Sequence, residues 1–261
     1  MKKVSFYFVL VFLFTITFFS CSNSKSNESS NFICLVDFSK SIPPSTLDWY
    51  REVIKNNIIA NLGAKDRVTV LPIDYGSQTS SSEIFVADLQ KQSFRKQFDS
   101  PLQQDIIAKR RLKIYIDSIE VLFDSAFNKA KVERSKYSQG TDIIGGFTQA
   151  NKYFTPGQNN MMVAFTDMIQ ETEQLDLYKS LSSEKDINIL LKKAPIPNFN
   201  KFDVFIMTGE QPKIKIEKYE LLKKFWQTYF SKTNLNLIQY ESGGENILVN
   251  KINSYKSNKD N

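Results

Sequence analysis

The sequence predicts an α/β fold in which a doubly wound, mostly parallel sheet is flanked by helices. Short apolar runs that fit buried strands alternate along the chain with longer stretches of helical periodicity, which is typical of parallel strands joined by crossover helices. The chain has 261 residues, 41% hydrophobic and 24% charged, which suffices for one large core. Because neither an internal repeat nor a shift in composition divides the sequence, we expect one domain.

The first expected strand is Phe32–Val36, a continuous apolar run of the kind found in strands buried on both faces. A helix should follow from Ser45 or Thr46, either of which can cap it, to about Leu62, with Gly63 as the stop. This succession of strand and helix is the first half of a crossover unit.

The second strand, Arg67–Ile73, contains Pro72, which must lie near the strand's end because proline cannot donate to a ladder. Ile84–Leu89 follows across a turn rich in Gly, Ser and Thr, and this suits an antiparallel edge strand. The strongest helical pattern then begins near Pro101 and ends before Tyr137, with an apolar stripe that we assign to core packing. The stripe consists of Leu112, Ile116, Ile119, Phe123, Ala126 and Ala130.

The second half of the chain continues the alternation. Apolar spacing predicts a helix with Ile143, Phe147, Ala150 and Phe154 on one face, and a polar tail is expected from Ser242. The other expected elements are strands over 161–165, 202–207 and 235–240, helices over 176–181 and 218–232, and a segment over 187–191 that suits either type.

The N-terminus fits a secretory signal. Lys2 and Lys3 precede an apolar run from Val4 to Phe19 that is short for a transmembrane helix. Ser20-Cys21 and the polar stretch after them resemble a bacterial lipoprotein signal, although Phe18 and Phe19 depart from its usual leucine and small residue. The alternative is a plain uncleaved anchor.

The lipoprotein resemblance implies that Cys21 is lipidated and becomes the mature N-terminus. The protein would then be anchored by lipid to a membrane of the bacterial cell envelope, on its periplasmic or surface side. The expected division is a signal peptide over 1–20, the lipidated cysteine with a flexible tether over 21–31, a domain over 32–251 and a polar tail over 252–261.

Composition excludes several classes of site. The chain has no histidine, so it cannot hold a catalytic triad based on histidine or a histidine-ligated zinc or haem. Its two cysteines are too few for a zinc cluster, and Cys34 is expected to be a buried free thiol. The net charge of +6 is spread along the chain, which argues against a nucleic-acid partner. Any metal must therefore be a hard cation held by oxygen atoms.

Polar side chains follow two of the expected strands and one loop. Asp37, Ser39 and Ser41 come directly after the first strand, Thr141 lies in a loop before a helix, and Asp167 ends the strand over 161–165. Ligands bind at the carboxyl ends of the strands in open parallel sheets, and alternate residues of an extended segment point the same way. If the two strands are neighbours, these oxygen atoms meet at one point, where they suit Mg²⁺.

These residues resemble the metal-ion-dependent adhesion site of von Willebrand factor type A (VWA) domains, which have a Rossmann-like fold. The family motif is Asp-x-Ser-x-Ser after the first strand, a later loop Thr and an Asp ending the fourth strand. The resemblance implies that Asp37, Ser39, Ser41, Thr141 and Asp167 bind Mg²⁺, Mn²⁺ or Ca²⁺. It also implies a protein partner that supplies an acidic side chain to the metal.

The chain departs from the family pattern at Lys40 and Met168, where a small residue and a glycine are common. Neither departure removes a ligand. Four of the five ligands also have a local alternative, because Ser39, Ser41, Thr141 and Asp167 could instead cap the helices that follow them.

Three functions are compatible with these observations. The first is a non-enzymatic, membrane-tethered binding module that uses a divalent cation for adhesion or protein–protein interaction. The second is a structural envelope lipoprotein whose site binds no metal. The third is a Mg²⁺-dependent phosphoryl-transfer enzyme of the haloacid dehalogenase type, against which stands Ser39 at the position of that family's second Asp.

Overall fold

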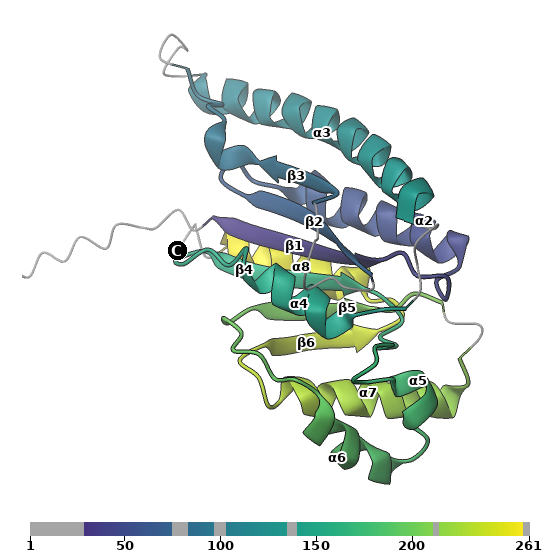
Figure 1. Cartoon of the computed structure of the whole chain (residues 1–261). Helices are drawn as coiled ribbons and strands as arrows, with labels where there is room; N and C mark the ends of the chain where they lie inside the picture. The colour runs from purple at the N-terminus through teal and green to yellow at the C-terminus, as the bar shows by residue number, and fades with distance from the viewer. Residues whose placement is uncertain (1–28, 75–82, 97–102, 135–139, 211–213, 258–261) are drawn as a thin grey trace, which may run out of the picture.

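The computed structural model describes residues 29–74, 83–96, 103–134, 140–210 and 214–257 (Figure 1). The leader with Cys21, most of the predicted tether and the predicted start of the long helix near Pro101 lie outside these residues. Within the described part, no helix is both long enough and apolar enough to cross a membrane.

A single six-stranded sheet organises the domain, with strand order β3-β2-β1-β4-β5-β6. Five strands are parallel, and β3 pairs antiparallel with β2 at one edge. The predicted fold class is confirmed, including its antiparallel edge strand. The strands are β1 (Ser30–Asp37), β2 (Arg67–Ile73), β3 (Phe85–Asp88), β4 (Asn159–Phe165), β5 (Asp203–Met207) and β6 (Asn236–Glu241).

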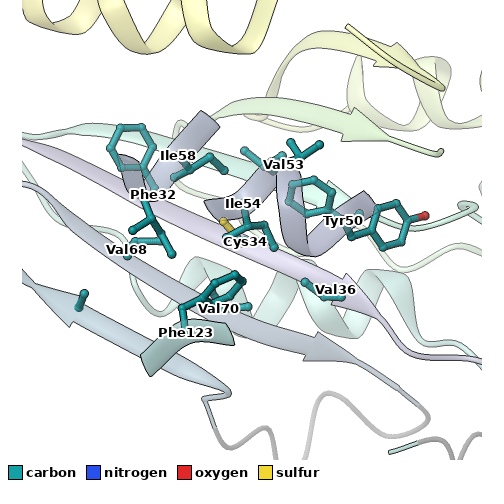
Figure 2. Close-up of a cluster of buried hydrophobic side chains, with 14 of the residues drawn as sticks. Phe32, Cys34, Val36, Tyr50, Val53, Ile54, Ile58, Val68, Val70 and Phe123 are labelled. Carbon is teal, nitrogen blue, oxygen red and sulfur yellow. The ribbon is translucent and has the colours of Figure 1, made fainter. Parts of the chain in front are cut away.

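Strand β1 is buried on both faces, and its alternate side chains enter two separate cores. Phe32, Cys34 and Val36 pack into one core, whereas Ile33 and Leu35 pack into the other. The period of two along a strand produces this division. Cys34 is a buried free thiol, as predicted, and lies among the side chains of the first core (Figure 2). Burial raises its pKa.

The first core is covered by α2 (Pro44–Val53), α3 (Gln104–Arg134) and α8 (Glu245–Ser257). Helix α2 continues through a π-helical segment to Ile58 and a 3₁₀ turn that ends at Asn61. The predicted capping by Ser45 or Thr46 is wrong. Pro43 is the N-cap and Pro44 is the first helical residue, a position where proline's missing N–H costs no hydrogen bond.

Helix α3 presents the predicted apolar stripe with one change. Ile116, Ile119, Phe123 and Ala130 are buried, but Phe127 is the buried residue in the turn where Ala126 was expected. The larger side chain gains more by burial than the alanine would. Phe127 then packs at 5.6 Å from the ring of Phe123.

The predicted polar tail is wrong as far as Ser257, both from Ser242 and in the narrower bounds over 252–261, because α8 extends through Ser257. Leu248, Ile252 and Tyr255 enter the first core, and the Tyr255 hydroxyl donates to Asp203 at 2.5 Å. This hydrogen bond joins α8 to the start of β5.

The second core lies on the other face of the sheet. Its helices are α4 (Ile143–Asn151), α5 (Leu177–Ser180), α6 (Glu184–Lys193) and α7 (Ile216–Phe230). Helix α6 resolves the ambiguous segment over 187–191. Every residue of both cores lies between Phe32 and Tyr255, so the segment from Ser29 to Ser257 contains a complete sheet with both of its faces covered.

Candidate metal site

The strand order places a topological switch point between β1 and β4. The chain moves outward from β1 to β2 on one side and from β4 to β5 on the other, and β1 pairs directly with β4. Crevices at such points, beyond the carboxyl ends of the strands, are where ligands bind in open α/β sheets. Asp37 is the last residue of β1, and Asp167 follows β4 by two positions.

Asp37 is fully buried, and both of its carboxylate oxygens accept hydrogen bonds. Oδ1 accepts from the backbone N–H of Ser39 at 2.8 Å, and Oδ2 accepts from the hydroxyl of Thr166 at 2.8 Å. The first bond turns the chain after β1, and the second ties β1 to β4. The carboxylate is therefore held from two elements that are far apart in sequence.

The loop after Asp37 brings two hydroxyls together. The hydroxyl oxygens of Ser39 and Ser41 lie 2.8 Å apart, so the predicted alternation does turn these side chains to one side. Ser39 is buried, whereas Lys40 and Ser41 are exposed. Lys40 forms no ion pair with any described residue, and no contact explains why a lysine stands there.

One carboxylate oxygen of Asp167 accepts a hydrogen bond, and the other has no hydrogen-bond partner among the described residues. Its Oδ1 accepts from the backbone N–H of Ile169 at 3.0 Å. Its Oδ2 is buried and has no hydrogen-bond partner among the described residues, although the Ser41 hydroxyl comes close enough to lower the carboxyl's pKa. A buried carboxylate oxygen without a partner is costly, and it is the kind of atom that a bound cation would satisfy.

The two carboxylates destabilise each other's ionised forms. Burial, the largest cause, raises the pKa of Asp37 to about 6 and that of Asp167 to about 7. The charge of Asp37 adds to the rise at Asp167, and the charge of Glu171 adds to both. The hydrogen bonds from Ser39 and Thr166 lower the pKa of Asp37 but do not offset burial. The site thus concentrates negative charge in a buried position, and no basic side chain among the described residues contributes to the pKa of either carboxyl.

Met168 adopts a left-handed backbone conformation, with φ of 60°. This explains why a glycine would be favoured there, since a side chain at positive φ costs on the order of 1 kcal/mol. Hydrogen bonds at both the N–H and the carbonyl of Met168 hold its backbone in this conformation. The Met168 N–H donates to the Thr166 hydroxyl at 3.1 Å, and its carbonyl accepts from the Trp226 indole at 2.8 Å.

Thr141 is buried beside this arrangement and is joined to it through Glu171. The N–H of Glu171 donates to the Thr141 carbonyl at 2.8 Å, and Glu171 is the residue whose charge reaches both aspartates. The structure therefore brings Asp37, Ser39, Ser41 and Asp167 together, and it holds Thr141 at the same end of the sheet through a backbone bond.

The local alternatives for these residues are wrong. The N-cap of α2 is Pro43, which leaves Ser39 and Ser41 without a capping role, and α4 is capped by Asp142 rather than by Thr141. Asp167 caps no helix either, because the next helix, α5, is capped by Asp176. Four polar residues that could have been explained as caps thus have no such explanation.

Sequence reasoning missed three residues of the site. Thr166 holds Asp37, Glu171 adds charge, and Gln170 fixes the loop before α4 by accepting from the N–H groups of Ile143 and Ile144 at 2.7 and 3.1 Å. The hydroxyl at the end of β4 was a visible signal for Thr166. Nothing in the local sequence distinguishes Glu171 from the other acids near it.

In the described part of the chain, no three His, Cys, Asp or Glu side chains are grouped so that they could hold a metal. The candidate site instead combines two carboxylates with serine and threonine hydroxyls. Such a donor set fits Mg²⁺ or Mn²⁺ better than a softer metal.

No family model matches this chain, and no curated protein does. Several solved structures are similar in fold. The pilus adhesin SpaC from Lactobacillus rhamnosus GG has 11% identity and a TM-score of 0.42, over 90% of this chain and 30% of the adhesin. An aerotolerance-related membrane protein from Bacteroides fragilis has 12% identity and a TM-score of 0.37, over 87% of this chain and 98% of that protein.

The VWA domain of SpRpn10 has 13% identity and a TM-score of 0.33, over 86% of this chain and 95% of that domain. This chain thus spans about a third of the adhesin and nearly all of the other two. With TM-scores below 0.5, these neighbours do not place the chain in a family.

Proposed function

We propose that this protein is a binding module of the VWA type that uses a divalent cation at Asp37 and Asp167 to engage a protein partner. The observation that carries the proposal is the buried Oδ2 of Asp167, which has no hydrogen-bond partner among the described residues. Two further observations support it, namely the paired hydroxyls of Ser39 and Ser41 and the raised pKa values of both carboxyls. A cation would give the Asp167 oxygen a partner and would stabilise the ionised forms of both carboxyls.

Asp37, Ser39, Ser41, Thr141 and Asp167 are the residues that would hold the ion, with Mg²⁺, Mn²⁺ or Ca²⁺ as candidates. When bound, the ion supplies a Lewis-acidic position that an outside carboxylate can fill. Two carboxylates balance the charge of a divalent ion and leave it electrophilic, because hydroxyls donate no further charge. The partner is therefore proposed to present an Asp or Glu side chain.

Isothermal titration of the domain with Mg²⁺ and Mn²⁺ tests the cation site. Binding is expected in the wild type and should be lost in Asp37→Ala. Asp74→Asn is the matched control, because Asp74 directly follows the neighbouring strand β2 and pairs with Arg134 instead. An absence of binding in the wild type, or equal binding in Asp37→Ala, would contradict the proposal.

A structural module without metal is the second candidate, and one observation favours it. With pKa values of about 6 and 7, the two aspartates can share protons near neutral pH and tolerate burial without an ion. Melting the domain in Mg²⁺ and in EDTA separates the candidates. A ligand that binds only the native state raises the melting midpoint, and the structural module predicts no shift.

The lipid anchor and the absence of enzymatic activity remain predictions. For the anchor, Cys21→Ser should release the expressed protein from the membrane fraction, and Cys34→Ser serves as the control because Cys34 is buried in the first core. For the activity, a phosphatase screen should find no turnover. Turnover that disappears in Asp37→Asn would favour the phosphoryl-transfer alternative.

A further inference from the structure

The edge of the sheet opposite the candidate site carries a row of lysines. Four parallel strands are entered through a connection from a preceding helix, and each of those connections contains one lysine. The four are Lys65 before β2, Lys152 before β4, Lys201 before β5 and Lys232 before β6. Strands β2 and β6 are four steps apart in the sheet, so the row extends for about 19 Å.

All four lysines are exposed, and none forms an ion pair with a described acidic residue. The same four connections contain a single acidic residue, Asp66. Asp66 is buried and fully engaged, since its Oδ1 accepts from the N–H of Ser30 at 2.9 Å and its Oδ2 accepts from that of Gly63 at 2.7 Å. Asp203 at the start of β5 and Asp88 at the end of the antiparallel β3 also lie at this edge, but they pair with Lys251 and Lys91. No described carboxylate therefore forms an ion pair with a lysine of the row.

The opposite edge has the reverse charge. A carboxylate ends or closely follows every parallel strand, namely Asp37, Asp74, Asp167, Glu210 and Glu241. The domain is thus polarised along its strands, with an acidic end at the candidate site and a basic end at the lysine row. A charge field of this kind orients a domain at a charged surface.

The chain enters the domain at the basic end. Ser29 is the first described residue, and its carbonyl accepts from the N–H of Asn159 at 3.1 Å, at the start of β4. The proposed anchor at Cys21 would leave residues 22–29 between the lipid and this edge, which span at most about 28 Å when extended. The surface nearest to the lysine row would then be the membrane.

We propose that the lysine row docks on the anionic headgroups of the membrane to which the chain is anchored, which directs the candidate metal site away from the lipid. This inference rests on the proposed anchor and is independent of cation binding. A lysine near an anionic surface strengthens membrane binding by about fivefold, so four act together even though each is weak.

Co-sedimentation of residues 29–257 with vesicles tests the docking in the absence of the anchor. In EDTA and at low salt, the domain should bind vesicles that contain phosphatidylglycerol and not vesicles of phosphatidylcholine alone, and added salt should release it. Replacing Lys65, Lys152, Lys201 and Lys232 by Gln should weaken binding by more than about a hundredfold.

The matched control replaces four exposed lysines away from that edge, Lys129, Lys179, Lys185 and Lys215, by Gln. It removes the same charge and should retain binding, and melting curves show that each variant is folded. Equal binding to both kinds of vesicle, no binding at all, or an equal loss in the control would overturn the docking. Because EDTA is present throughout, none of these outcomes bears on the cation site.

Discussion

The two edges of the sheet handle charge in opposite ways. At the carboxyl edge, Asp37 and Asp167 are buried together and Met168 is strained beside them. At the amino edge, the lysines are exposed, and the buried carboxylate of Asp66 has a partner for each oxygen. Burying like charges lowers stability, whereas exposed lysines cost almost nothing. The costly arrangement of Asp37 and Asp167 marks the carboxyl edge as the candidate for ligand binding.

The largest expected effect is on cation binding, and it separates the two edges most clearly. Asp167→Asn should weaken Mg²⁺ binding by more than about a hundredfold, because it removes the charge of a proposed direct ligand. Isothermal titration measures the change. Lys201→Gln at the other edge should leave the affinity unaltered, and a similar loss in both variants would break the comparison.

The second prediction concerns the pH dependence of the cation-free domain. The pKa values of Asp37 and Asp167 are raised to about 6 and 7 in the folded state, above the value of about 3.9 for an unfolded aspartate. The folded state therefore binds more protons. The stability that these groups contribute is present below about pH 4 and is lost as pH rises through 6 to 7.

Denaturant unfolding in EDTA should show this loss as a fall in the free energy of unfolding, on the order of a few kcal/mol, between pH 5 and pH 8. Asp167→Asn should reduce the fall, because one of the two coupled carboxyls no longer titrates. A wild-type curve that is flat or rises over this interval would contradict the assignment of a buried, uncompensated pair.

Met168→Gly tests the strain beside the site, where two effects compete. Glycine removes the cost of the left-handed conformation, about 1 kcal/mol, but it also removes a fully buried side chain worth about 2–4 kcal/mol. The variant should therefore be less stable by roughly 1–3 kcal/mol in urea unfolding. Met168→Ala keeps the strain and loses similar burial, so it should be less stable than the glycine variant, and the reverse order would contradict the strain.

The smallest effect belongs to the lysine row. Lys232→Gln should change the free energy of unfolding by less than about 0.5 kcal/mol, because the side chain is exposed and has no ion-pair partner among the described residues. A larger loss would mean that the row is part of the folded structure rather than a surface for docking.

The sheet could be predicted from the sequence because its strands are continuous apolar runs with sharp polar ends. Helix α8 could not, because its three buried residues lie in a stretch dominated by Asn, Ser and Lys, so that packing rather than composition decides it. The start of α2 was missed because Ser45 and Thr46 are better caps than proline, yet the turn after Ser41 places Pro44 at the first helical position.

The candidate site was predictable where it is local. The alternation of Asp37, Ser39 and Ser41 is a short-range pattern, and the structure confirms that the two hydroxyls meet. The bond between Thr166 and Asp37 joins residues 129 positions apart and depends on the pairing of β1 with β4. The unpaired oxygen of Asp167 arises from that packing as well, so no sequence pattern could reveal it. The left-handed backbone at Met168 had an indirect signal, because the family pattern commonly has a glycine at that position.

The most direct test of the cation site is the melting midpoint of the domain at pH 8, measured in Mg²⁺ and in EDTA. The site predicts a higher midpoint in Mg²⁺ for the wild type, because the ion binds only the folded state and offsets the repulsion between Asp37 and Asp167. It predicts no shift for Asp167→Asn. Equal midpoints for the wild type in the two solutions would contradict the account.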